Sequence, residues 1–404
     1  MTLNAAGARP DLPGFALLRL ACAYAVATSG TILMPLIVAM LMRRFGAGEG
    51  AATGTAGLEI LGIALTCALL PRWVAHAPRR IAWLGMAGTL VAQAASAAMP
   101  DLATVGAARA VAGVFEGMLF VVVAASLSNR GAAERAWGFI ILAGGVFDGA
   151  LLVGAACLPH ADDAWLFPLF AAAFALIALP TARAGLHALD AIAVPRRAGA
   201  APGWATLVPI WVVMTLVYGV LAGQWAIADV IGQRVGLAPA QSGLLLSLAS
   251  IVGLAGCLAA SHRRSHALRL PIIRGAQLAL AAAVVWFFAV SGATGFFLSQ
   301  LLVTLAFYAI TPFLTARLSA LDADGALVAR SIVITFISVA AGTALAGSLL
   351  AGLGPMGCGL ALGACALASI PFARAAFVHG RGGAPAAAAH GCAEPTPAPA
   401  PEAS

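Results

Sequence analysis

The sequence has no lysine and little charge of any kind. All 22 basic residues among its 404 are arginines, and charged residues make up only 9% of the chain, against 62% hydrophobic residues. A water-soluble domain carries about 25% charged residues, so most of this surface must contact something other than water. The formal charge of +7 does not indicate nucleic acid binding, because the arginines lie mainly in short loops between apolar segments.

Motifs of several enzyme classes are also missing. The chain has no phosphate-binding GxxxxGK[ST] sequence, no cluster of metal ligands and no nucleophile elbow, so we expect no ATP hydrolysis, no metal and no other cofactor. The seven cysteines are scattered, and an odd number does not form a disulfide framework. We interpret them as small buried hydrophobic residues. They are Cys22, Cys67, Cys157, Cys257, Cys358, Cys365 and Cys392.

Apolar segments long enough to cross a bilayer recur along almost the whole chain. A transmembrane helix needs about 20 predominantly apolar residues. Segments of this kind are predicted near residues 14–42, 53–71, 81–99, 102–127, 136–158, 164–182, 205–228, 240–260, 270–290, 293–316, 327–350 and 355–377. The first is far longer than the apolar region of a signal peptide, so we expect it to remain. The predicted fold class is an all-α membrane protein of about twelve transmembrane helices.

The arginines give the predicted orientation. Sixteen flank one side of the predicted spans and three flank the other, and basic loops stay in the cytoplasm. We therefore expect a multi-pass protein of a bacterial-type inner membrane, with both termini cytoplasmic. The sixteen are Arg9, Arg72, Arg79, Arg80, Arg130, Arg135, Arg183, Arg196, Arg197, Arg263, Arg264, Arg269, Arg317, Arg330, Arg374 and Arg381, and the three are Arg43, Arg44 and Arg234.

The two halves of the chain resemble each other. Ala56-Gly57-Leu58 and Ser242-Gly243-Leu244 open equivalent spans, and the pairs Arg79-Arg80 and Arg263-Arg264 follow those spans at nearly the same offset. This order predicts two pseudo-symmetric six-helix bundles, and parallel repeats of this kind place a binding site near the midplane where they meet. The predicted units are an N-terminal bundle at 1–183, a cytoplasmic linker at 184–203, a C-terminal bundle at 204–378 and a Pro-rich disordered tail at 379–404.

Local motifs point to one family. In the fourth span, Arg109 is followed by Gly113 and Gly117 at four-residue steps, and such glycines let a neighbouring helix approach closely. The loop after the second span ends in Arg79-Arg80. With twelve spans, two parallel halves and a basic linker, these features resemble the major facilitator superfamily of secondary transporters. The loop departs from the superfamily pattern G-x-x-x-D-R-x-G-R-R, since Ala75 stands in place of the acidic residue of a gating salt bridge.

The fifth span has a partial match to one branch of that superfamily. Gly145, Gly149 and Gly154 fit the G-x-x-x-G-P-x-x-G-G pattern of drug/proton antiporters, whereas Ala150 replaces the proline and Val153 replaces one glycine. This resemblance favours export. Tight packing between helices would select the same glycines.

Besides Arg19, which lies near the end of its span and can reach the membrane surface, four charged residues lie within the predicted spans of the first half. Such a group is costly at membrane depth unless it is paired or hydrated, so each is a functional candidate. Glu116 and Asp148 lie nearest the midplane and are candidates for carrying a proton, or else are acids hydrogen-bonded to a neighbouring helix. Arg109 and Glu59 lie in the outer third. Arg109 is either an anchor for an anionic substrate group or the structural partner of Glu59.

The second half carries amide and aromatic side chains instead of charge. The family resemblance implies that helices 1, 4, 7 and 10 line a central cavity. Tyr218, Gln224, Trp225 and Asp229 follow one another on the seventh span, and Gln300 and Tyr308 lie on the tenth. These side chains would suit recognition of an amphipathic organic molecule. For Trp225, anchoring at the membrane interface is the alternative.

These observations predict a secondary active transporter that moves a small organic solute by alternating access, driven by the proton gradient and directed towards export. We expect a monomer in the lipid bilayer that binds no nucleic acid and is not an enzyme. Two alternatives stay open: a polytopic membrane enzyme acting on lipid, and a transporter-like sensor that moves no solute. An enzyme would need a polar catalytic cluster in an interfacial loop, whereas these loops are short and dominated by arginine.

Overall fold

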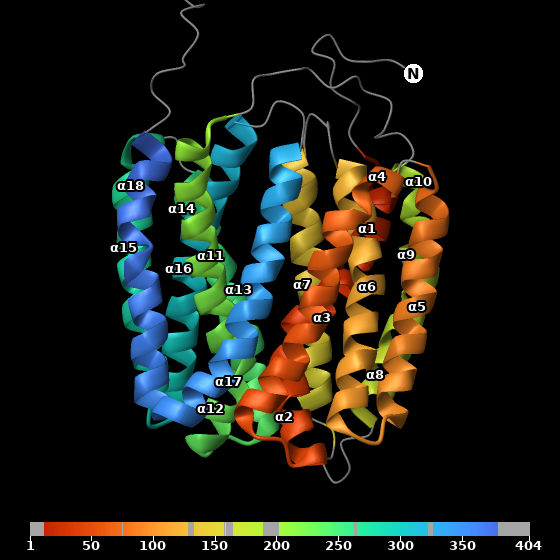
Figure 1. Ribbon diagram of the computed structural model, residues 1–404, viewed down its shortest axis with the longest axis horizontal. Helices are drawn as coiled ribbons and strands as arrows, with labels where there is room; N and C mark the ends of the chain where they lie inside the picture. Colours follow the sequence, from red (N-terminus) through yellow and green to blue (C-terminus); the bar gives the residue numbers. More distant parts are fainter. Residues whose placement is uncertain are drawn as a thin grey trace, which may run out of the picture.

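Helices make up the body of the protein. The computed structural model describes residues 12–74, 76–127, 133–156, 158, 165–188, 202–261, 265–321 and 326–378. Among these residues there is no strand, and the long helices stand side by side over the height of the molecule (Figure 1). Most of the predicted linker 184–203 and the whole predicted tail 379–404 lie outside the described residues.

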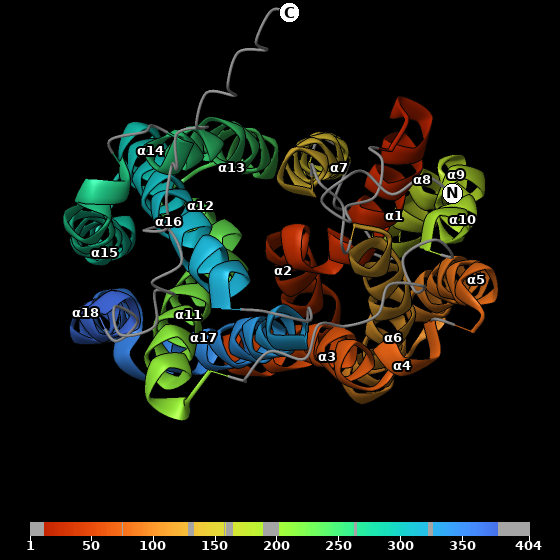
Figure 2. The same cartoon turned by 90° about the horizontal axis from the view of Figure 1, so that it is seen from above.

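The helices fall into two groups when they are viewed from above (Figure 2). One group contains α1 (Gly14–Ile32), α2 (Met34–Phe45), α3 (Glu49–Leu69), α4 (Pro71–Val74), α5 (Pro78–Ala98), α6 (Leu102–Leu127), α7 (Ala133–Ala156), α8 (Leu166–Leu176), α9 (Ala178–Arg183) and α10 (Gly185–Ala188). The other contains α11 (Trp204–Ala226), α12 (Ala228–Arg234), α13 (Pro239–Gly253), α14 (Leu258–Ser261), α15 (Ser265–Phe288), α16 (Ala293–Leu321), α17 (Ala326–Ala368) and α18 (Ile370–Val378). The groups meet where α3 packs against α17 and α7 packs against α13.

Ten helices of the described chain are long and apolar enough to cross a membrane. The difference from the predicted twelve segments arises at two places. Arg330–Phe377 is one helical run interrupted at Gly354, whose φ of 68° only glycine adopts readily, and the chain reverses direction there (Figure 1). The predicted span 164–182 is broken at Ile177 into α8 and α9. Each of the twelve predicted segments is thus mainly helical in its described residues, but they do not form twelve uninterrupted spans.

The first predicted span, 14–42, is also not a single helix. It breaks at Leu33 into α1 and α2, because Pro35 has no N–H to donate to the carbonyl of Thr31. The amide of Leu36 turns to the carbonyl of Leu33 (3.0 Å), so the carbonyl of Ile32 also loses its helical donor. An equivalent break in the second half separates α11 from α12.

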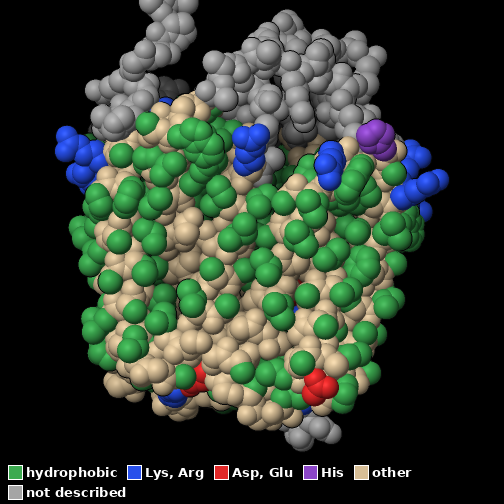
Figure 3. All heavy atoms as spheres, viewed as in Figure 1, with side chains coloured by type: hydrophobic (Ala, Val, Ile, Leu, Met, Phe, Trp, Pro, Cys, Tyr) green, Lys and Arg blue, Asp and Glu red, His purple; other side chains and the backbone are tan. Residues whose placement is uncertain are grey.

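The outer surface is suited to lipid. On the face shown in Figure 3, apolar side chains cover the middle of the molecule, arginines gather at its upper end, and acidic side chains lie at its lower end. Large apolar side chains are exposed along many of the helices, among them Leu65, Leu84, Val91, Leu176, Leu345 and Leu360. In water such a surface would aggregate, so the protein is a multi-pass membrane protein.

Candidate functional site

Arg109 and Glu59 form an ion pair in the interior of the N-terminal group. The Nε of Arg109 donates to one carboxylate oxygen of Glu59 (3.1 Å), and its Nη2 donates to the other. Its Nη1 donates to the amide oxygen of Gln93 on α5 (2.8 Å). The guanidinium also lies over the ring of Phe167 on α8, 5.0 Å from its centroid. Both charged side chains are fully buried. The three guanidinium nitrogens all donate hydrogen bonds to Glu59 or Gln93, so none of them needs water.

The glycines of α6 bring this pair together. A Cβ on Gly113 would overlap the backbone carbonyl of Glu59, and one on Gly117 would lie only 3.1 Å from the Cα of Ile63. The close approach predicted for these glycines is therefore confirmed, and their neighbour is α3. Glu59 sits at the middle of α3 instead of its outer third, because that helix begins at Glu49, four residues before the predicted start.

The two remaining buried acids of this half have no such partner. Glu116 on α6 and Asp148 on α7 have no exposed surface, and no carboxylate oxygen of either accepts a hydrogen bond from a described residue. Glu116 lies within electrostatic reach of Glu59, Arg109 and Asp148. The hydroxyl of Thr28 lies near Asp148, but it donates to the carbonyl of Tyr24 (2.9 Å). Glu116 thus lies beside the side chain of Glu59 on α3 and Asp148 beside that of Thr28 on α1, and both predicted roles, proton carriage and a hydrogen bond to a neighbouring helix, stay predictions.

Aromatic side chains from both halves surround the interior near Asp148. In the first half, the ring of Tyr24 lies 6.1 Å from Trp137 and 6.2 Å from Phe120. Phe120 in turn meets Phe336 of α17 edge to face at 5.0 Å, which crosses from one half to the other. Sequence reasoning missed these four rings. Tyr24 carried a signal, since it lies at mid-depth and is one of only three tyrosines in the chain.

The predicted residues of the second half divide into three sets. Tyr218 packs on Phe307 with the ring centroids 4.9 Å apart, and Phe307 also meets Tyr308 at 5.2 Å. Gln224 and Gln300 are both buried and are joined by a hydrogen bond of 2.7 Å between their amides. Asp229, at the beginning of α12, accepts a hydrogen bond from Gln233 of the same helix (2.7 Å).

Trp225 lies between the two halves. Its indole Nε1 donates to the carbonyls of both Thr31 and Ile32, each at 3.1 Å. These are the two acceptors that the break before Pro35 leaves free. Neither predicted role of Trp225, substrate recognition or interfacial anchoring, anticipates this contact.

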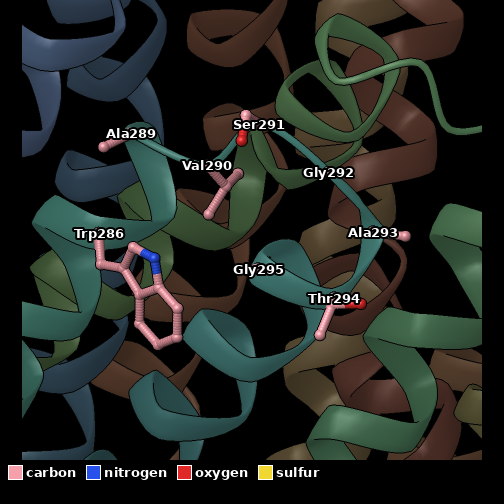
Figure 4. A pocket seen from close by; sticks show the side chains of 8 residues that line it. All are labelled: Trp286, Ala289, Val290, Ser291, Gly292, Ala293, Thr294 and Gly295. Carbon is pink, nitrogen blue, oxygen red and sulfur yellow. The ribbon is translucent and has the colours of Figure 1, made fainter.

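A pocket at the turn between α15 and α16 is separate from these residues. It is lined by Trp286 and by residues 289–295, and Figure 4 shows no charged side chain among them. It contains none of the predicted site residues. The part of the chain that the structure describes also holds no group of three or more potential metal ligands.

The fold is that of known membrane transporters. The human organic anion transporter MFSD10 (TETRAN) matches with a TM-score of 0.63 and 18% identity, over 90% of this chain and 100% of that one. A D-xylose–proton symporter matches with a TM-score of 0.67 and 15% identity, over 88% of this chain and 96% of that one. The peptide transporter POT matches with a TM-score of 0.65 and 15% identity, over 89% and 95%. No protein-family model matches the chain, and no curated protein matches its sequence.

The chain therefore has the fold of major facilitator superfamily transporters, as the sequence resemblance predicted. At this level of identity the likeness shows the fold, and it does not single out the drug/proton antiporter branch.

Proposed function

We propose that this protein is a proton-coupled secondary transporter that moves a small organic solute across the inner membrane by alternating access. The observation that carries this proposal is the pair of buried carboxyl groups, Glu116 and Asp148, near the middle of α6 and α7 without hydrogen-bond partners. A buried acid without a partner is expensive and marks an ion pathway by default. One of the two loads and releases the proton as it is exposed first to one side and then to the other.

Contacts at one end support alternating access. Arg234 at the end of α12 forms an ion pair with Glu49 at the start of α3. Nearby, the hydroxyl of Thr53, which donates to the carbonyl of Glu49 (2.9 Å), lies 3.4 Å from the carbonyl oxygen of Ala344 on α17. These two contacts and the Trp225 bonds hold the two halves together at the end that carries α2 and α12 (Figure 1). Opening the solute path to that side requires all of them to break.

The arginine distribution assigns this closed end to the periplasm and the opposite, basic end to the cytoplasm. The N-terminal end of α1 and the C-terminal end of α18 both lie at the basic end (Figure 1), which supports the proposal of cytoplasmic termini. The glycine pattern of α7 favours export as the direction of transport. We also propose that the protein acts as a monomer, since both halves of the solute path belong to one chain.

Of the three α7 glycines that fit the antiporter pattern, only Gly149 borders the other half. The hydroxyl of Ser247 on α13 donates to its carbonyl (3.2 Å). A Cβ on Gly145 or Gly154 would meet nothing within 4 Å. Tight packing therefore does not account for those two glycines, which supports the functional interpretation of the pattern.

Proton coupling is tested in proteoliposomes that contain a trapped pH-sensitive dye. The panel of solutes is xylose, a dipeptide, an aromatic carboxylate and an aromatic quaternary amine. At least one solute should exchange across the membrane and move protons with it. Glu116→Gln or Asp148→Asn should then abolish flux driven by a pH gradient while one of them keeps solute exchange. If both variants keep the gradient-driven flux of the unmodified protein, neither carboxyl carries the proton. If no solute exchanges or moves protons, the transport proposal itself is wrong.

A further inference from the structure

The three tyrosines of the chain gather around one point. Tyr24 lies near the middle of α1, Tyr218 on α11 and Tyr308 on α16. Tyr24 is within electrostatic reach of both other tyrosines and of Asp148. All three side chains are partly exposed although each lies near the middle of its helix, and Tyr24 of one half is near Tyr218 and Tyr308 of the other. The three rings therefore border the same region between the two halves.

This tyrosine–acid site, made of Tyr24, Tyr218, Tyr308 and Asp148, is built for positive charge. The face of a tyrosine ring attracts a cation, and most strongly where water is excluded. Asp148 is fully buried, the Thr28 hydroxyl beside it donates to the carbonyl of Tyr24, and no arginine is among the groups within electrostatic reach of it. A buried carboxylate in this position needs a counter-ion, and the described residues do not supply one.

An anionic substrate finds no matching partner here. Arg109 is the only arginine buried in the interior of the described helices, and its three nitrogens already donate to Glu59 and Gln93. Arg19 lies more than one turn from Tyr24 towards the end of α1, with its guanidinium 5.2 Å from the ring centroid of Phe15. Neither guanidinium is free to bind a carboxylate beside the tyrosines.

We infer that the solute of this transporter is a monovalent aromatic or quaternary organic cation, which lies between Tyr24 of one half and Tyr218 and Tyr308 of the other with Asp148 as its counter-ion. This inference rests on the proposed transport function and adds the substrate class. It also divides the two acids. Asp148 binds the positive charge of the substrate. Glu116, which lies near the charges of Glu59 and Arg109, carries the proton. Because the site draws rings from both halves, a bound cation couples their relative movement.

Three probes of one size and shape test the substrate charge on the unmodified, full-length protein. They are 1-methyl-4-phenylpyridinium as cation, 4-biphenylmethanol as neutral analogue and biphenyl-4-carboxylate as anion. Equilibrium binding to the purified protein and exchange in proteoliposomes are measured for each. The cation should bind at least about tenfold more tightly than the neutral probe, and the anion should not compete. Equal binding of cation and neutral probe, or preference for the anion, overturns the inference.

Variants then locate the binding. Asp148→Asn should remove the preference for the cation, whereas Asp101→Asn, an exposed acid at the beginning of α6, should keep it. Tyr24→Leu should weaken cation binding by about fivefold, and Tyr24→Phe, which keeps the ring, by less than about twofold. A cation preference that survives Asp148→Asn in folded protein overturns the assignment. If Asp148→Asn does not fold, the Tyr24→Leu and Tyr24→Phe comparison decides.

The results also separate this inference from the function on which it rests. If the anion or the neutral probe exchanges and the cation does not, the protein is a transporter of another substrate class and only the inference fails. If none of the three probes binds or exchanges while xylose or a dipeptide does, the same conclusion follows. If nothing is exchanged at all, both proposals fail.

Discussion

The indole nitrogen of Trp225 lies 3.1 Å from the backbone carbonyl of Thr31, and this contact joins the two halves of the molecule. Its acceptor exists because Pro35 leaves that carbonyl without its helical donor. A side chain of one half thus completes the hydrogen bonding of a broken helix in the other, at the end where the halves are closed.

Removing this bond should favour opening at that end. Trp225→Phe keeps an aromatic ring but has no donor, and a net hydrogen bond is worth about 1 kcal/mol. We expect the open population to rise about fivefold, measured as a longer distance between spin labels at Ala51 and Gln241, both exposed near this end. Arg234→Gln is the matched comparison. Arg234 is partly exposed, so its pair with Glu49 should contribute less. A distance distribution unchanged by Trp225→Phe would show that the bond does not hold the closed state.

We expect the loss of Arg109 to reduce the stability of the folded protein, whatever its effect on transport. Breaking a buried ion pair leaves an uncompensated charge and is worth about 3–5 kcal/mol. Arg109→Gln should therefore lower the yield and the melting temperature of the purified protein, and Glu59→Gln should do the same. The double variant should recover most of both, because two neutral amides leave no buried charge. A folded Arg109→Gln protein that has lost only solute binding would instead make Arg109 a substrate anchor.

The contact between α3 and α6 should not tolerate a single methyl group. Gly113→Ala would push a Cβ into the carbonyl of Glu59, and overpacking of this kind is worth about 1–3 kcal/mol. Gly145→Ala is the control, since its Cβ would meet nothing within 4 Å and alanine favours a helix. We expect a clear fall in melting temperature for the first variant and no fall for the second. Equal melting temperatures would mean that α3 and α6 are further apart than described.

The proposed topology is tested by a reporter fused to the C-terminus. A fluorescent protein that matures only in the cytoplasm should be bright there, and an alkaline phosphatase that needs the periplasm should be inactive. The same two reporters placed in the turn after α2, at the proposed periplasmic end, provide the control and should give the opposite result. Active phosphatase at the C-terminus would reverse the orientation of the whole molecule.

The fold was predictable from the sequence because bilayer thickness sets the length of each apolar segment. The pairing of Arg109 with Glu59 was predictable because a buried charge needs an opposite charge nearby, although Glu59 lies deeper in its helix than predicted. The break at Leu33 does not follow from the length of the apolar run; its sequence signal is Pro35, which lacks the N–H that a continuous helix needs. Tyr24, Trp137 and Phe336 were missed for another reason. The contacts of a helix depend on its rotation about its own axis and on the angle at which it crosses its neighbours. A nearly uniform apolar sequence predicts neither of these.

The break in α1 has a consequence for how the closed end tolerates change. Because Trp225 binds two main-chain oxygens, no replacement of the Thr31 or Ile32 side chain deletes the acceptors. Only position 35 controls them: an alanine there would restore an N–H, allow α1 to continue through Leu33 and withdraw the Thr31 carbonyl from Trp225. Side-chain substitutions at Thr31 or Ile32 therefore leave both acceptors in place, and Pro35 keeps the two carbonyls available to the indole of Trp225.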